Sequence, residues 1–330
     1  MRCPSCASTQ SKPLYAVGQR LLLPLAAQSV TVRRCLKCHI LYRFPQPERS
    51  DIPNDDPDVF DPPPERDAAR LKRFLTEAYR RLMLHTHVRW VRPIIRQQRR
   101  AGGRVRLLDV GCGDGLFLEG CGIPFGRTAG LDCSLAAVKA AGKRGIGAVR
   151  GSLLDFPFAE KTFSLVTLFH VFEHLTRPDA HLRAVRRMLT QDGDLLIQVP
   201  NADSLQAGLF KGRWAGFDPP WHLIHYSPDT LKKVLRRNGF KVIRCAHFSL
   251  RDNAAMAARS LFPEFYPPVR AIRQPSKSSI DAWGADLLFL GAVTVLQPFA
   301  VLESLLGRGA AVMVHAKPDK WGGASDSSFD

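Results

Sequence analysis

Three aspartates and a glycine-rich loop have types and spacings that suit the binding of a nucleotide. The stretch 111–115 reads Gly-Cys-Gly-Asp-Gly and follows the apolar run 107–110, which contains the first of these aspartates, Asp109. Glycines let the backbone adopt positive φ and let a ligand approach closely. Asp132 follows about 20 residues later, where a carboxylate can accept hydrogen bonds from both hydroxyls of a ribose. Asp155 stands beside apolar residues, where it can accept from the exocyclic amine of an adenine.

Two histidine-containing segments could move a proton, because imidazole titrates near neutral pH. The first is His170-x-x-Glu173-His174. Its side chains could bind a divalent cation, or they could cap a helix and line a pocket. The second is Trp214–Tyr226, whose aromatic residues and prolines predict a lid over a substrate. Within it, His222 could act as a general base or could only fix the lid by hydrogen bonds.

Four cysteines near the N-terminus form two Cys-x-x-Cys pairs, which are typical of a structural zinc site. So short a segment would hardly fold without the metal. The alternative is four unrelated, redox-active thiols. The remaining cysteines are scattered, which favours a reducing compartment over a disulfide framework. The predicted ligands are Cys3, Cys6, Cys35 and Cys38, and the scattered thiols are Cys112, Cys121, Cys133 and Cys245.

Strands and helices that alternate along the chain would position these residues. Such alternation predicts a doubly wound, mostly parallel sheet whose strands end at one shared edge. The predicted strands are 107–110, 127–131, 148–151, 163–169, 194–199, 240–247 and 309–317. The predicted helices are 116–120, 135–144, 180–189 and 228–238, the last with Ser227 as N-cap.

This ordered set resembles the class I S-adenosylmethionine-dependent methyltransferases. The resemblance rests on Asp109-Val-Gly-Cys-Gly-Asp-Gly115, Asp132, Asp155 and the stretch 169–175, and it extends from residue 107 to 317. It implies a Rossmann-like sheet of seven strands, the last antiparallel between the fifth and sixth, and S-adenosylmethionine as cofactor. The residues that it places at the cofactor are Asp109, Gly111, Cys112, Gly113, Gly115, Asp132, Cys133, Leu154, Asp155 and Phe169.

The resemblance also implies a small-molecule acceptor. The stretch 222–231 resembles a His-Leu-x-x-(Phe/Tyr)-Ser-x-x-Thr-Leu pattern of small-molecule methyltransferases. The matching pairs are His222-Leu, Tyr226-Ser and Thr230-Leu. In similar sugar C-methyltransferases a histidine at this place is the general base, preceded by Glu. Here Trp221 precedes His222, which disfavours carbon methylation. We therefore expect O-methylation of a hydroxylated metabolite, sugar or glycolipid precursor.

In this interpretation the catalytic group consists of His222, His170, Glu173 and His174. Similar enzymes that methylate quinone-precursor phenols carry the pattern acid-x-x-Glu-His at the end of the fourth strand, and this pattern is proposed to hold a divalent cation. In this chain the first position of the pattern is a histidine, His170. An RNA methyltransferase, whose zinc knuckle would help to recognise RNA, is one alternative. It is disfavoured because no Asn-Pro-Pro-(Tyr/Phe) signature follows the fourth strand. A non-catalytic homologue that only binds the cofactor is another alternative.

The chain has a net charge of +17, which attracts polyanions. Much of this charge lies between Arg66 and Arg106, which we interpret as a solvated helical face rather than a nucleic-acid surface. The same stretch predicts one helix that Pro93 interrupts. The segment 285–306 approaches the length of a membrane span but contains charged residues and a proline. It predicts a buried lid, a homodimer contact or a peripheral membrane contact. The first two, in which the segment is buried against protein, are favoured over contact with a membrane.

These patterns divide the chain into five parts. We expect a zinc-ribbon-like module over 1–50, a Pro/Asp-rich linker over 51–65, a catalytic domain over 66–248 and 309–320, a helical insertion over 249–308 and a disordered tail over 321–330. The opening MRCPSC contains no apolar leader segment, so we expect a cytoplasmic protein, with peripheral contact at the inner face of the membrane if 285–306 binds lipid.

Overall fold

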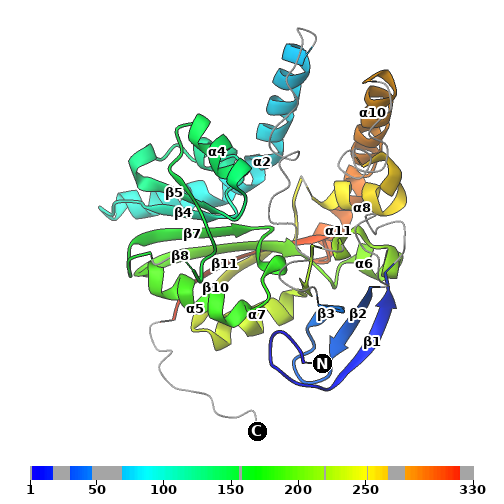
Figure 1. The fold of residues 1–330 in the computed structure, drawn as a ribbon, viewed down its shortest axis with the longest axis horizontal. Helices are drawn as coiled ribbons and strands as arrows, with labels where there is room; N and C mark the ends of the chain where they lie inside the picture. Colours follow the sequence, from blue (N-terminus) through cyan, green and yellow to red (C-terminus); the bar gives the residue numbers. More distant parts are fainter. Residues whose placement is uncertain are drawn as a thin grey trace.

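A computed structural model of the chain contains two β-sheets with helices packed around them (Figure 1). It describes residues 2–17, 30–46, 69–155, 158–218, 221–250, 252–266 and 279–319. The predicted linker and tail therefore lie outside the described residues.

The larger sheet has seven strands in the order β10-β11-β8-β7-β4-β5-β6. Strands β4 to β8 are parallel to one another, and β11 runs antiparallel between β8 and β10. This is the predicted Rossmann-like methyltransferase sheet, so the expected fold class is confirmed. The strands are β4 (Leu107–Val110), β5 (Thr128–Asp132), β6 (Ala148–Arg150), β7 (Phe163–Phe169), β8 (Leu189–Pro200), β10 (Phe240–Ala246) and β11 (Ala311–Pro318).

Helices cover both faces of this sheet, as Figure 1 shows, with α2 and α4 on one side and α5 and α7 on the other. The central strands are largely apolar because both of their faces are buried. Separate hydrophobic clusters fill the two sides. The helices are α2 (Ala69–Arg100), α3 (Leu116–Gly120), α4 (Leu135–Lys143), α5 (Pro178–Met188) and α7 (Pro228–Arg237).

Two local predictions were wrong. Helix α2 continues through Pro93. Both Pro93 and Arg89 are exposed, so water can solvate the Arg89 carbonyl that loses its N–H partner. Strand β8 begins at Leu189, where a helix end was expected, and it passes through Gly193, where a turn was expected. Leu189 is buried and pairs with Phe163 of β7, so pairing and burial prevail over the local turn signal.

The smaller sheet joins the cysteine-rich N-terminal segment to the body of the protein. Its order is β1-β2-β3-β9, with β1 (Ser11–Ala16), β2 (Thr31–Cys35), β3 (Leu41–Phe44) and β9 (Ile224–His225). Leu41 pairs with His225 and Tyr42 with Ile224, and the Arg43 N–H donates to the Leu223 carbonyl over 3.0 Å. The N-terminal segment therefore holds the stretch that follows His222, a connection that the sequence pattern did not predict.

The insertion after β10 contains α8 (Asn253–Leu261), α10 (Ser279–Val295) and α11 (Gln297–Leu305). Helix α8 packs against both of the others through small apolar side chains. The stretch Gly284–Leu305 is long and apolar enough to cross a membrane, with a mean hydropathy of 1.8. Only 11 % of its most apolar 18 residues are buried, however. Leu287 is 62 % exposed and Leu305 is 81 % exposed. The described residues therefore do not bury this segment as the expected lid.

Candidate active site

The glycine loop connects β4 to α3 and bends through three positive φ angles. Gly111, Gly113 and Gly115 have φ of 73°, 53° and 77°, a region that side chains with a Cβ rarely adopt. A Cβ on Gly111 would lie 2.2 Å from a methyl of Val171, and a Cβ on Gly115 would lie 2.9 Å from Ile146. The glycines are therefore needed for the turn itself and for its contact with the segment that follows β7.

Asp132 closes β5 and fixes this loop. One of its oxygens accepts from the Gly113 N–H over 2.9 Å, and the other accepts from the Ser134 N–H over 2.9 Å. The side chain is partly exposed, and a carboxylate has about four lone-pair sites, so acceptor capacity remains for the hydroxyls of a ligand. These features fit the ribose of S-adenosylmethionine, because the acid stands at the carboxyl edge of the sheet.

The other residues predicted at the cofactor surround this loop with different degrees of exposure. Cys112 is buried with its sulfur close to Gly130, where an added Cβ would lie 2.6 Å from it. Leu154 and Phe169 are partly buried, and Cys133 and Asp155 are exposed. The structure therefore leaves Asp155 accessible for an adenine amine and gives Cys112 a packing role.

Asp109 lies inside the protein. The Thr167 hydroxyl on β7 donates to it over 2.6 Å, and burial raises the pKa of Asp109 to about 7. Only 4 % of this residue is exposed. In this structure it therefore couples β4 to β7 beneath the loop rather than facing a ligand.

Asp114 of the loop anchors two helices, a role that the sequence reasoning missed. Arg80 of α2 donates to both of its oxygens over 2.9 and 2.8 Å, and Arg144 donates over 3.0 Å. These cations hold the pKa of Asp114 below its ordinary value, although burial opposes them. Because the pairs join residues 30 and more positions apart, no local pattern could have revealed them.

Glu173, His174 and His222 gather beyond the end of β7. Their metal-binding atoms all lie within 4.8 Å of one another. The His222 Nε2 is 3.8 Å from a Glu173 oxygen, and the rings of His174 and His222 meet edge to face with centroids 4.9 Å apart. Glu173 is 1 % exposed. The structure thus brings together three of the four residues of the predicted catalytic group.

His170, the fourth, faces a different set of groups. It has a φ of 57°, and its Nε2 lies 3.1 Å from Asp252 and 3.0 Å from the Gln198 amide. Its Nδ1 remains 3.5 Å from Glu173. Burial would lower the pKa of His170, but Asp252 and Glu173 outweigh it and raise that pKa to about 9. His170 is thus a charged partner of Asp252 and Glu173 rather than a further member of the group that Glu173, His174 and His222 form.

Residues of the insertion complete the wall of this site. Arg259 of α8 forms an ion pair with Asp218, which in turn lies 3.8 Å from the His222 Nε2. Asp252 also precedes α8 directly. Burial lowers the pKa of His222 and lowers that of His225 to about 3. Sequence reasoning missed Asp218, Asp252 and Arg259, since nothing in their local pattern marks them as parts of a site.

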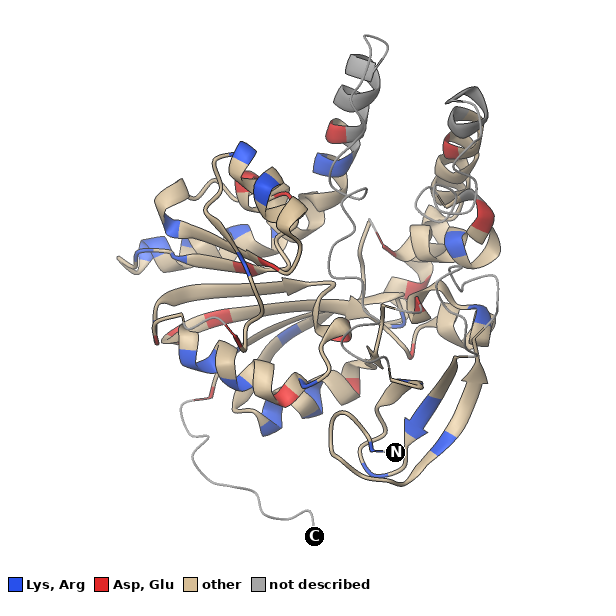
Figure 2. Ribbon diagram, in the orientation of Figure 1, with Lys and Arg blue, Asp and Glu red and all other residues tan. Residues whose placement is uncertain are grey.

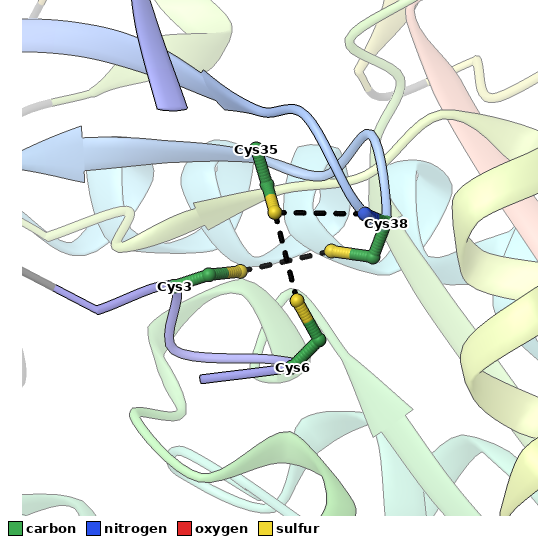
Figure 3. Close-up of side chains that lie close together, drawn as sticks. All are labelled: Cys3, Cys6, Cys35 and Cys38. Carbon is green, nitrogen blue, oxygen red and sulfur yellow. Dashed lines mark hydrogen bonds between the residues drawn. The ribbon is translucent and has the colours of Figure 1, made fainter. Parts of the chain in front are cut away.

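The four N-terminal cysteines converge, as Figure 3 shows. The sulfurs of Cys3 and Cys38 are 3.6 Å apart, and those of Cys6 and Cys35 are 3.5 Å apart. Four sulfurs at about 2.3 Å from one Zn²⁺ would lie about 3.8 Å from one another, so the arrangement fits a tetrahedral site. The Cys38 N–H also points to the Cys35 sulfur at 3.5 Å.

Comparisons with known proteins agree with this geometry. Residues 57–244 match a family described as a methyltransferase domain. An uncharacterized protein of Mycobacterium tuberculosis is 30 % identical over 186 residues, which cover 54 % of this chain and 61 % of that protein. A tRNA U34 carboxymethyltransferase of Pseudomonas fluorescens is 30 % identical over 159 residues, which cover 44 % of this chain and 48 % of that enzyme. The chain thus spans between about half and two thirds of the length of these relatives.

A solved structure of a similar fold is an S-adenosylmethionine-dependent methyltransferase from Thermotoga maritima, described as a possible histamine N-methyltransferase. It is 16 % identical, the match covers 75 % of this chain and 97 % of that chain, and the TM-score is 0.45. The family match covers more than half of the 330 residues, and the sheet order is the one that the sequence predicted. The chain belongs to the class I S-adenosylmethionine-dependent methyltransferases.

Proposed function

We propose that this enzyme methylates a hydroxyl group of a small metabolite, a sugar or a glycolipid precursor. S-adenosylmethionine supplies a methyl group on a sulfonium that is already a good leaving group. The chain must therefore position the acceptor and take up the proton of its hydroxyl. The observation that carries the proposal is the group of the buried Glu173 with His174 and His222 beside the carboxyl edge of the sheet.

His222 is our candidate for the proton acceptor. Its Nδ1 lies 2.8 Å from the Gly216 carbonyl, so Nδ1 donates and Nε2 keeps its lone pair. That lone pair faces the site, where Glu173 can stabilise the imidazolium that forms after proton transfer. His174 is a second candidate, because its Nδ1 lies 2.8 Å from the Trp221 carbonyl and its Nε2 is free to accept.

For the cysteine cluster we propose a structural zinc ion. The sulfur distances support a closed site with four thiolates and no open position. Strand β3 follows the second cysteine pair and pairs with β9. Zinc would therefore stabilise the stretch that presents His222, and it would take no part in the chemistry.

Contact with a lipid surface is consistent with a glycolipid precursor as acceptor. The exposed leucines of α10 and α11 lie on helices that pack against α8. Helix α8 also supplies Arg259 to the wall of the site. An acceptor held in a membrane could therefore reach the site beside the surface that binds the lipid.

An RNA acceptor is the second candidate, because one relative is a tRNA U34 carboxymethyltransferase. Arg89, Arg92 and Arg96 are exposed on α2 and could contact phosphates. Figure 2 shows, however, that Lys and Arg are spread over helices on both sides of the sheet rather than gathered on one face. We therefore favour the small-molecule acceptor.

The test is to incubate the protein with methyl-labelled cofactor and separated metabolite, lipid and RNA fractions of a cell extract. We expect label in the metabolite or lipid fraction, and label in RNA alone would overturn the proposal. His222→Gln should abolish the transfer but leave cofactor binding intact. His85→Gln, which changes an exposed histidine of α2, is the matched control and should transfer at the wild-type rate.

A further inference from the structure

Glu173 is a buried carboxylate that lacks the donors such a group normally has. Only 1 % of the residue is exposed, and neither carboxylate oxygen has a hydrogen-bond partner among the described residues. The nearest cation is His170, whose Nδ1 lies 3.5 Å from Glu173 and whose Nε2 lies closer, 3.1 Å, to Asp252, so its charge is shared between two acids and offsets only part of the cost of burying Glu173. A buried ionised group without donors costs several kcal/mol, roughly, unless a cation or another ligand compensates it.

The two imidazoles beside it are arranged as metal ligands usually are. In both His174 and His222, Nδ1 lies 2.8 Å from a backbone carbonyl. In the neutral rings Nδ1 therefore carries the proton and Nε2 keeps a lone pair. The His222 Nε2 lies 3.8 Å from a Glu173 oxygen, and a ring nitrogen of His174 lies within 4.8 Å of both groups. A metal-bound histidine typically donates its other ring N–H to a carbonyl or carboxylate, which fixes the ring.

A protonated His222 would not satisfy Glu173 in this geometry. The His222 Nε2 lies 3.8 Å from the Glu173 oxygen, which is too long for a hydrogen bond. Two ligand atoms that each lie about 2.1 Å from one metal ion are about 3.0 to 3.5 Å apart. The His222 Nε2 and the Glu173 oxygen would therefore have to move only slightly closer together to bind the same ion. The neighbouring acids are occupied, because Asp218 pairs with Arg259 and Asp252 with His170.

We propose that Glu173, His174 and His222 form a binding site for a divalent transition-metal ion such as Zn²⁺, Mn²⁺ or Fe²⁺. Two imidazoles and one carboxylate suit these ions, whereas Mg²⁺ prefers oxygen ligands. Three protein ligands leave coordination positions open. The site is distinct from the four cysteines, because its ligands come from the end of β7 and from the stretch before β9.

The consequence for catalysis rests on the proposed function. An open position would accept the hydroxyl oxygen of the acceptor and make its proton more acidic. The proton would leave to water, the oxygen would bond to the methyl carbon, and the carbon–sulfur bond would break with its electron pair on sulfur. His222 would then act as a ligand instead of as the proton acceptor.

Metal analysis tests the site without any assay of activity. Protein whose cysteine site is already filled with zinc is titrated with Co²⁺, and the spectrum is recorded. We expect a second equivalent of metal whose absorption lacks thiolate charge transfer, because the three ligands of this site are one carboxylate and two imidazoles. Excess Zn²⁺ should displace it, and excess Mg²⁺ should not.

Glu173→Gln should weaken Co²⁺ binding at least about 100-fold, since a charged ligand is lost. His222→Gln provides a second variant should the first fail to fold. His85→Gln is the matched control and should bind Co²⁺ as the wild type does. Circular dichroism and binding of the demethylated cofactor establish that each variant is folded.

Two results would overturn the inference. One is a wild-type protein that binds metal only at its cysteines, and the other is a second equivalent that persists in both variants. Methyl transfer by a protein without the second metal would leave the proposed function standing with His222 as the base. A bound second metal without label in any small-molecule or lipid fraction would instead refute the proposed function alone.

Discussion

Replacement of Asp132 by alanine is expected to weaken binding of the cofactor or its demethylated product strongly. In the proposed complex the carboxylate accepts from both ribose hydroxyls. Each hydrogen bond to a charged group contributes about 1.5 to 3 kcal/mol. Two such bonds amount to about 3 to 6 kcal/mol, and each 1.4 kcal/mol is about a tenfold change in Kd. We therefore expect the Kd of Asp132→Ala to rise by about 100-fold or more.

The structure adds a second contribution to this loss. Asp132 also accepts from the N–H groups of Gly113 and Ser134, so alanine leaves both donors without their acceptor. The glycine loop would then lose the contact that fixes its shape before any ligand arrives. Asp132→Asn keeps the size of the side chain and one acceptor oxygen, and its Kd should lie between those of the wild type and the alanine variant.

Isothermal titration calorimetry with the demethylated cofactor measures these constants directly. Asp229→Ala is the matched control, since it removes a carboxylate from an exposed position at the start of α7 and should leave the Kd unchanged. An Asp132→Ala protein that is folded and binds with the wild-type Kd would refute the assignment of this acid to the ribose. An equal loss in Asp229→Ala would show that net charge, rather than a local contact, governs binding.

Three further predictions concern pH, zinc and lipid. Burial raises the pKa of Asp109 to about 7, above about 3.9 in unfolded chains, so the native state retains a proton that the unfolded state loses. The free energy of unfolding should therefore fall by about 3 kcal/mol from about pH 5 to 8 because of this group, and urea titrations of Asp109→Asn should lack that part of the fall. Removal of the proposed zinc ion from the four cysteines by a chelator should release β3 from β9 and abolish methyl transfer, while calorimetry still detects cofactor binding; retained transfer by protein whose cysteines hold no metal would contradict this. Leu287→Glu combined with Leu305→Glu should prevent co-sedimentation with anionic vesicles, whereas Asp203→Lys on another exposed surface should not; equal sedimentation of both would exclude these helices as the lipid contact.

The fold was largely predictable because its signals are local. Strand β4 and helix α3 have the predicted bounds, and Ser227 caps α7 as expected, with Thr230 completing a capping box. The order of the sheet followed from the resemblance and from the alternation of elements. The sequence did not predict the pairing of β3 with β9 or the salt bridges of Asp114, because each joins segments that are far apart in the chain.

The candidate site was harder to predict, and His170 illustrates why. The spacing of His170, Glu173 and His174 suggests one helical face, where residues three and four positions apart are neighbours. The chain instead takes a positive φ at His170 and then forms a 3₁₀ turn, Phe172–His174. This conformation directs His170 to Asp252 and leaves Glu173 and His174 to meet His222, which arrives from a stretch held by β3. The composition of the site therefore depends on one backbone torsion and on a strand pairing between distant segments. Gly111 contributes to the same outcome, since a Cβ there would displace Val171 and with it the turn that carries Glu173.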